Sequence, residues 1–138
     1  MRKIYYRVKL TNYVDIEEYA KGIIKDSDIH KVELNARIDT GATHISLPDE
    51  IAKKLGLRVI DRVKVRYANG KVEEKPKGSI VEIEILGRKT HTSPIIEGNG
   101  EILVGNPILE ELDILINTKT GELYVNPESP DMPIAELL

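Results

Sequence analysis

Residues 36–48 read Ala-Arg-Ile-Asp-Thr-Gly-Ala-Thr-His-Ile-Ser-Leu-Pro, and the rest of the chain is interpreted from this stretch. It places one acid, Asp39, in a tight turn at the end of a hydrophobic strand and just ahead of a short helix. Gly41 allows the chain to turn at φ values that other residues avoid, so the Asp39 carboxylate can lie close to backbone N–H groups. An ordinary β-turn, with Asp and Gly in their usual turn roles, explains the same triplet. The surrounding sequence has to distinguish these two interpretations.

The composition limits the classes of protein to which the chain can belong. Its 138 residues, 41% hydrophobic and 31% charged, suffice for a folded core, and we expect one domain over residues 1–138. A net charge of −3 argues against a dedicated surface for nucleic acid or anionic membranes. The absence of cysteine excludes disulfides, thiol catalysis and zinc–thiolate sites. No apolar run reaches membrane-spanning length and the N-terminus lacks a signal-peptide apolar region, so we expect a cytoplasmic protein.

The first part of the chain predicts two paired strands with a helix between them. Apolar residues alternate over residues 4–10 and again over residues 29–38, as in half-buried strands. Thr11-Asn12 is expected to end the first strand. The apolar spacing over residues 13–25 suits a helix, against which only Gly22 counts.

A second helix is predicted over residues 47–57, directly after the Asp39 turn. Pro48 suits the first helical position, acids occupy the first turn and lysines the last, and Gly56 supplies the C-terminal cap.

A polar hairpin follows this helix. Residues 58–67 alternate as a strand, and Asn69-Gly70 predicts a type I′ turn because both residues tolerate positive φ. The returning arm, residues 71–77, is polar and basic, so it cannot pack into a core. We expect the hairpin to project into solvent and to be mobile, either as a functional element or as an ordinary exposed hairpin.

The last part of the chain predicts six more elements and a tail. The residues from Ile102 to Gly105 indicate a buried inner strand ending in a tight turn, followed by a helix that starts near Asn106 with Pro107 at its first position. The proline-containing tail, residues 126–138, should be extended at first, and its apolar end needs a surface to cover. Further strands are expected at residues 79–86 and 89–96, and a last hairpin is formed by residues 113–117 and 122–125.

Four motifs occur in a characteristic order: Ile-Asp-Thr-Gly-Ala at 38–42, the helix at 47–57, Asn69-Gly70, and Ile-Leu-Val-Gly-Asn-Pro-Ile-Leu at 102–109. Together they resemble the retropepsin-like aspartic proteases, and most closely the single-domain, non-viral cellular and archaeal members. The resemblance covers about residues 29–125. It implies an all-β fold, a closed acid-protease-like β-barrel with two or three short helices and one lobe per chain. Residues 1–28 then add an N-terminal strand and a helix insertion, and residues 126–138 add the tail.

The resemblance also implies an aspartic endopeptidase that acts as a homodimer. Peptide hydrolysis by acids needs two carboxylates that share one proton, one acting as general base on water and the other as general acid. The chain has a single Asp-Thr-Gly, so the pair would come from Asp39 of two chains related by a two-fold axis. Extended peptides or unfolded proteins would be the substrates. The resemblance implies no cofactor and no metal.

Residue roles follow from the same resemblance. Asp39 would be the catalytic acid/base, Thr40 would hydrogen-bond across the dimer axis, Gly41 would point its N–H toward the carboxylate, and Ala42 would line the substrate channel. The hairpin would be a flap that closes over the peptide, with Arg66, Tyr67, Ala68, Asn69, Gly70 and Lys71 at its tip. The inner-strand turn of Val104, Gly105 and Asn106 would support the active-site loop.

Two other functions are compatible with the residues. A catalytically silent retropepsin-like module could bind extended peptides or dimerise a partner with the same fold. Nucleic-acid binding is disfavoured because its candidate cations alternate with acids on an acidic chain and suit a solvated face. These cations are Lys53, Lys54, Arg58, Arg62, Lys64, Arg66, Lys71, Lys75 and Lys77. The three histidines, His30, His44 and His91, are too scattered to predict a metal site.

Overall fold

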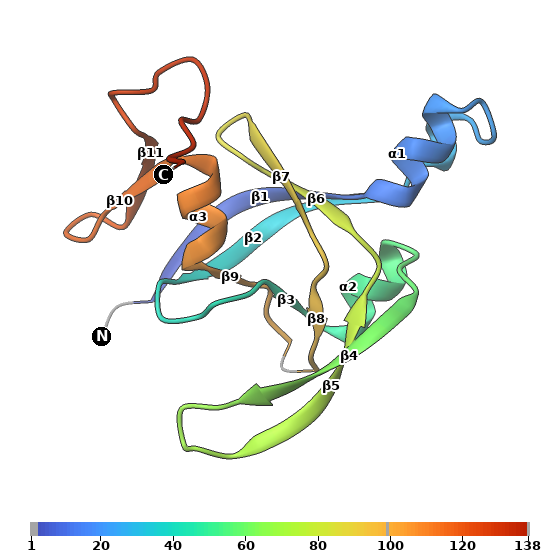
Figure 1. The fold of residues 1–138 in the computed structure, drawn as a ribbon, viewed down its shortest axis with the longest axis horizontal. Coiled ribbons are helices and arrows are strands. Elements are labelled where there is room, and N and C mark those ends of the chain that lie inside the picture. The colour runs from blue at the N-terminus through green and yellow to red at the C-terminus, as the bar shows by residue number, and fades with distance from the viewer. Residues whose placement is uncertain (1–2, 99, 138) are drawn as a thin grey trace.

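The fold was analysed in a computed structural model that describes residues 3–98 and 100–137. Within these residues most elements are strands, and they form one strongly curled sheet with a separate hairpin beside it (Figure 1). The strands are β1 (Ile4–Asn12), β2 (Lys31–Asp39), β3 (Ser46–Leu47), β4 (Val59–Arg66), β5 (Val72–Gly78), β6 (Val81–Ile85), β7 (Arg88–Thr92), β8 (Ile95–Ile96), β9 (Leu103–Gly105), β10 (Ile114–Asn117) and β11 (Glu122–Val125). The helices are α1 (Tyr13–Ala20), α2 (Asp49–Lys54) and α3 (Asn106–Leu112), with a 3₁₀ turn at Asp26–Asp28.

The large sheet has the strand order β4-β5-β8-β3-β9-β2-β1-β6-β7, and β10 pairs only with β11. This arrangement confirms the expected mostly-β lobe with short helices. No helix of the described residues has both the length and the apolarity needed to cross a membrane. The ends of the expected domain, Met1-Arg2 and Leu138, lie outside the described residues, as does Asn99.

The first two strands pair as the alternation predicts, with Ile4 opposite Ile38 and Leu10 opposite Val32. β1 includes Thr11 and Asn12 and is therefore two residues longer than the predicted strand over residues 4–10. Asn12 then caps α1, its Oδ1 accepting a hydrogen bond from the backbone N–H of Asp15 at 3.1 Å. The helix ends at Ala20, well before residue 25, because Gly22 adopts a φ of +75°.

The second helix is confirmed but is shorter than the predicted range of residues 47–57: α2 spans Asp49–Lys54. Pro48 is its N-cap with an extended ψ of 156°, and Asp49 is the first helical residue. Gly56 has a φ of +65° and ends the helix as expected. Ile51 and Leu55 are buried on its inner side.

The polar hairpin is formed by β4 and β5 and is called the hairpin below. It lies at one edge of the sheet and projects from the body (Figure 1). Its turn is not of type I′, because only Gly70 has a positive φ and Asn69 does not. The two-residue turn with positive φ at both positions is Leu86-Gly87 instead, between β6 and β7.

The strand expected over residues 89–96 is divided into two. β7 pairs with β6, whereas β8 pairs with β3 and with β5. The interruption at Ser93-Pro94 has a physical reason, since a proline cannot donate to a ladder. β8 then joins the hairpin to the body, because it pairs with β3 on one side and, at Ile95 opposite Lys77, with β5 on the other.

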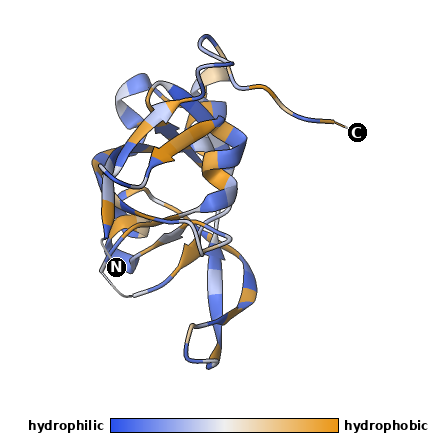
Figure 2. Cartoon of the chain, turned by 90° about the vertical axis from the view of Figure 1, so that its left-hand side faces the viewer, coloured by the Kyte–Doolittle hydropathy of each residue, from blue (hydrophilic) through white to orange (hydrophobic). Residues whose placement is uncertain are grey.

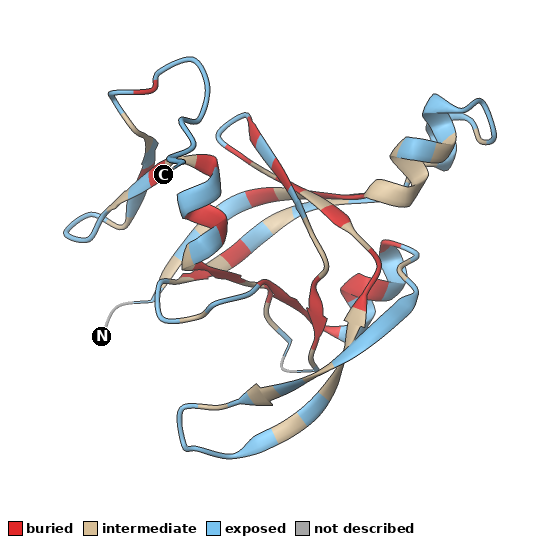
Figure 3. Cartoon of the chain, viewed as in Figure 1, coloured by how far each residue is buried: buried red, intermediate tan, exposed pale blue. Residues whose placement is uncertain are grey.

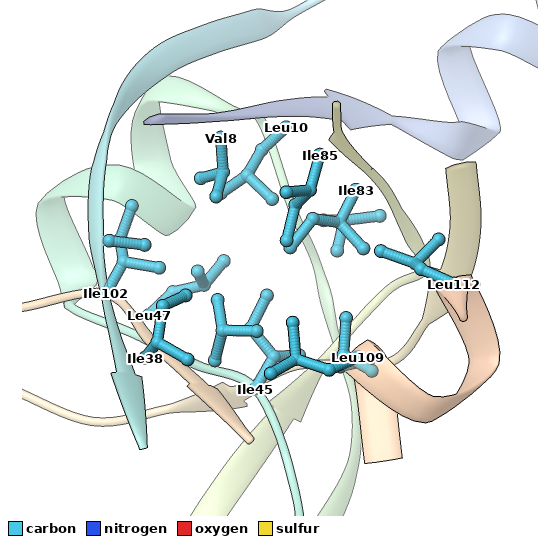
Figure 4. Close-up of a cluster of buried hydrophobic side chains, with 14 of the residues drawn as sticks. Val8, Leu10, Ile38, Ile45, Leu47, Ile83, Ile85, Ile102, Leu109 and Leu112 are labelled. Carbon is cyan, nitrogen blue, oxygen red and sulfur yellow. The ribbon is translucent and has the colours of Figure 1, made fainter. Parts of the chain in front are cut away.

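The core lies inside the curled sheet and under α2 and α3 (Figure 4). It collects fully or almost fully buried aliphatic side chains from elements far apart in sequence, among them Val8, Leu10, Ile38, Ile45, Leu47, Ile83, Ile85, Ile102, Leu109 and Leu112. Each such side chain contributes about 1.5–3 kcal/mol when removed from water. Figure 3 shows that burial follows β1, β3 and β9, whereas the hairpin is exposed or only partly covered.

The C-terminal tail is anchored mainly at Asp113, to which the backbone N–H groups of Asn126 and Ile134 donate at 3.1 and 3.2 Å. Ser129 is buried, and its Oγ donates to Asp113 Oδ2 at 2.6 Å. Beyond it, Ile134 is 53% and Leu137 92% exposed, and the chain runs away from the body (Figure 2). The expectation that the apolar end covers a surface is therefore wrong for the single chain.

Candidate active site

Asp39 is the last residue of β2, where a strand buried in the core reaches the surface. Its neighbour Ile38 is 5% exposed, while Asp39 itself is half-buried and Thr40 is exposed. β2 runs parallel to β9, which places Asp39 opposite Gly105. The acid is thus fixed on one side by the sheet and open on the other.

The carboxylate of Asp39 is held by its own turn. The backbone N–H of Gly41 donates to Asp39 Oδ1 at 2.9 Å, and the N–H of Ala42 donates to the Asp39 carbonyl at 3.1 Å. Gly41 does not have a positive φ, so the reason given from the sequence is wrong. A Cβ at Gly41 would lie 3.3 Å from Asp39 Oδ1, so the carboxylate would have to shift by a few tenths of an ångström.

Residues 39–45, from the end of β2 to the start of β3, are called the Asp39 loop below. The turn at Gly105-Asn106 packs directly against this loop. The N–H of Asn106 donates to the Ala42 carbonyl at 3.0 Å. A Cβ on Gly105 would lie only 2.7 Å from the carbonyl oxygens of Ala42 and His44. Val104 is fully buried, and the side chain of Asn106 donates to Glu110 at 2.8 Å. The inner strand therefore supports the Asp39 loop through backbone contacts that leave no room for a side chain.

Beside the loop is an open pocket of about 720 Å³. Exposed Thr40 lines it together with Asn106 and Pro107 at the start of α3, and Ile134 of the tail forms part of another wall. The surface next to Asp39 is therefore hollow and partly apolar, as expected of a surface on which another polypeptide can lie.

The predicted tip residues lie together in the hairpin turn. Arg66, Ala68, Asn69 and Gly70 are exposed, and the hairpin closes with a bond from the Tyr67 N–H to the Lys71 carbonyl at 2.8 Å. In Figure 1 this turn points to the same side of the molecule as the segment between β2 and β3, which contains the Asp39 loop.

Tyr67 connects the hairpin to the body. Its hydroxyl donates to Glu97 Oε1 at 2.9 Å. Burial raises the pKa of Tyr67 to about 12, and the hydrogen bond to Glu97 adds to the shift. Glu73, on the returning arm, pairs with Lys71 at 3.0 Å and with Lys75 at 3.5 Å, and the bond to Lys71 lowers the pKa of Glu73.

Glu97 was missed by the sequence reasoning. No motif includes it, and the only local signal is its position after the apolar pair Ile95-Ile96 and before a glycine. Its relation to Tyr67 is a tertiary contact between residues thirty positions apart.

Within the described residues, the Asp39 carboxylate has no hydrogen bond to a histidine side chain. His44 is exposed and contacts Thr43, His30 contacts Asp15 at 2.8 Å, and His91 contacts Glu82 at 3.1 Å. Over residues 3–98 and 100–137, no group of His, Asp and Glu side chains is arranged to hold a metal ion.

Comparisons with known proteins agree with this geometry. Residues 26–111 match the family model described as "gag-polyprotein putative aspartyl protease". The fold is similar to EIAV protease complexed with the inhibitor HBY-793, at a TM-score of 0.54 and 17% identity over 79% of this chain and 86% of that one. It is also similar to the retroviral protease-like domain of Ddi1 from Leishmania major, at a TM-score of 0.55 and 15% identity over 92% and 90% of the two chains. No curated protein matches the sequence. At these identities the two structures support the fold, and the matched residues include the Asp39 loop and the turn beneath it.

Proposed function

The chain belongs to the gag-polyprotein aspartyl protease family, which has the retropepsin-like fold, and from this premise we propose that it is an aspartic endopeptidase active as a homodimer. The observation that carries the proposal is the Asp39 loop. A single carboxylate stands at the end of a buried strand and accepts from the Gly41 N–H. Its loop packs against Gly105, and the next residue, Thr40, lines an open pocket.

The chemistry requires a second carboxylate. One Asp39 activates water as a general base while the other donates a proton to the carbonyl oxygen and then to the leaving amine. The chain has one Asp-Thr-Gly, so the second acid comes from a second copy. A two-fold axis brings the same surface of two chains together, which sets the two Asp39 loops opposite each other. Exposed Thr40 is then available to hydrogen-bond to the partner loop, and Ala42 lines the channel.

The substrate in this proposal is an extended peptide or an unfolded protein. The hairpin closes over it as a flap and excludes water, and an extended backbone can hydrogen-bond to neighbouring strands. Residues of about 29–125 form the catalytic lobe in this proposal, flanked by the α1 segment and by the tail.

The decisive experiment is cleavage of an unstructured protein between about pH 3 and 7, comparing the wild type with Asp39→Asn. Asp26→Asn, an exposed acid in the 3₁₀ turn, is the matched control. We expect Asp39→Asn to abolish cleavage, Asp26→Asn to retain it, and a transition-state-mimicking inhibitor to block it. Equal, negligible cleavage by all three proteins, with peptide binding retained, would identify the catalytically silent module instead.

Dimer dependence is tested by mixing. When wild-type and Asp39→Asn chains exchange freely, activity should fall with the square of the wild-type fraction, because only dimers with two intact acids work. A linear fall means that each chain acts alone, which contradicts the shared centre.

A further inference from the structure

The hydrogen bond between Tyr67 and Glu97 spans from the free end of the hairpin to the body of the lobe. Near its base, the hairpin is joined to β8, with Lys77 opposite Ile95 and the Gly78 N–H donating to the Pro94 carbonyl at 2.8 Å. Tyr67 lies at the other end, directly after β4. Without a contact there, the outer part of the hairpin would pivot about its base.

Glu97 is well placed to hold it. Its backbone N–H donates to the Leu47 carbonyl at 2.8 Å, so its position is set by the body. Both Glu97 and Tyr67 are half-buried, which shields their hydrogen bond from water. Burial and the bond to Glu97 raise the pKa of Tyr67 to about 12, which keeps its hydroxyl protonated as the donor at neutral pH.

The alternating burial of the hairpin strands shows which side faces the body. Val63, Val65 and Tyr67 of one arm and Glu73 and Lys75 of the other are half-buried, and burial alternates along both arms from the tip as far as Lys75. Val65 lies opposite Glu73 and Val63 opposite Lys75, so these side chains share one face. Tyr67 continues this face toward the tip, and holding Tyr67 therefore holds the inner face of the hairpin against the lobe.

We propose that Glu97 is a positioning residue that acts through Tyr67 to hold the hairpin down over the side of the lobe that carries Asp39. This inference rests on the proposed function, in which an extended peptide lies beneath the hairpin. Glu97 then sets how long the hairpin stays closed on the bound peptide. Its effect falls on substrate retention, because Glu97 supplies no group to the reaction.

The first test measures hairpin opening without any activity. Trypsin cuts after lysine or arginine, and Arg66 and Lys71 flank the hairpin turn, whereas Lys119 in the exposed β10–β11 turn is an internal reference site. When opening is fast relative to cleavage, the cleavage rate follows the population of the open form. We expect Tyr67→Phe to raise cleavage at the hairpin about tenfold relative to Lys119, as for loss of one hydrogen bond.

Matched variants separate this contact from general destabilisation. Tyr124→Phe, on β11, removes an exposed tyrosine hydroxyl and should leave hairpin cleavage unchanged. Glu97→Ala should also raise cleavage at the hairpin, by no more than Tyr67→Phe does, because the Tyr67 hydroxyl interacts with Glu73 as well. The double variant should equal Tyr67→Phe, because without the hydroxyl Glu97 has no bond to lose. Glu97→Gln keeps an acceptor without the charge and should lie between the wild type and Glu97→Ala. Additive effects in the double variant, or no change in any of them, would overturn the inference.

The second test is kinetic. In Tyr67→Phe and Glu97→Ala we expect KM to rise several-fold while kcat is little changed, with Glu97→Gln restoring part of the loss. Faster trypsin cleavage with an unchanged KM would overturn the positioning role, since the hairpin would then open without releasing substrate. If no variant, including the wild type, cleaves peptides, the proposed function fails, while the trypsin rates still decide whether Glu97 holds the hairpin.

Discussion

Gly105→Ala tests whether the inner strand supports the Asp39 loop. The added Cβ would lie 2.7 Å from the carbonyl oxygens of Ala42 and His44 and 2.8 Å from the His44 nitrogen. These are backbone atoms, which cannot rotate away like the end of a side chain, and the Ala42 carbonyl is also held by the Asn106 N–H. Overpacking costs about 1–3 kcal/mol, and contact with three backbone atoms places this substitution near the upper end.

The expected shift can be measured by thermal unfolding. An unfolding entropy of about 2.1 cal/mol/K per residue means that about 3 kcal/mol lowers the Tm of a chain of 138 residues by about 10 °C. Circular dichroism at one fixed chain concentration is the assay, because dimerisation makes Tm depend on concentration. The displaced loop carries Thr40 and Gly41, so cleavage should also fall by more than the unfolded fraction explains.

Gly98→Ala is the matched control. No atom lies within 4 Å of a Cβ at Gly98 and its φ is not positive, so we expect a Tm within about 3 °C of the wild type. If Gly105→Ala also melts within about 3 °C of the wild type and cleaves normally, the support of the Asp39 loop by Gly105 is refuted.

Three further substitutions give separate tests. Leu112→Ala, at a fully buried site, should destabilise the protein by about 2–5 kcal/mol in urea unfolding, and Leu115→Ala, at a side chain 39% exposed, by less than half as much. Gly41→Ala should reduce cleavage far more than Tm, because its Cβ would lie 3.3 Å from the neighbouring aspartate; equal losses in both would argue against this. The hydrogen bond from the Ser129 hydroxyl is the main cause that lowers the pKa of Asp113 in the folded chain. The ionised carboxylate therefore stabilises the fold at pH values above its unfolded pKa of about 4, and this stabilisation is lost as the pH falls through the lower, folded pKa. Asp113→Asn should therefore flatten the acid side of a Tm-against-pH curve, and an unchanged slope would contradict the assignment.

The alternation of apolar residues was sufficient to predict most strands. β1 and β2 were predicted with their pairing, and the inner strand before Gly105 was predicted from its apolar run. The split between β7 and β8 was missed, although Pro94 within the run was a signal for it. α1 ends at Ala20, earlier than the apolar spacing predicts, because Gly22 adopts a positive φ that a helix does not allow.

Turn geometry was harder to predict. Asn69-Gly70 has the residues of a type I′ turn, yet Leu86-Gly87 has the positive φ values. Leucine disfavours this region, so no propensity predicts it. The reason is tertiary: Ile85 pairs with Arg88, which leaves two residues to connect β6 and β7, and strand twist favours a type I′ connection there.

The sequence by itself determined the local elements, because periodicity, caps and glycines act over a few residues. It placed Asp39 at a strand end and an exposed polar hairpin after the second helix. Only the tertiary structure decided that Gly105 packs under the Asp39 loop and that Tyr67 reaches Glu97, thirty residues away. Both contacts depend on the order in which strands distant in sequence lie side by side, and that order is set by packing the shared core rather than by any local preference.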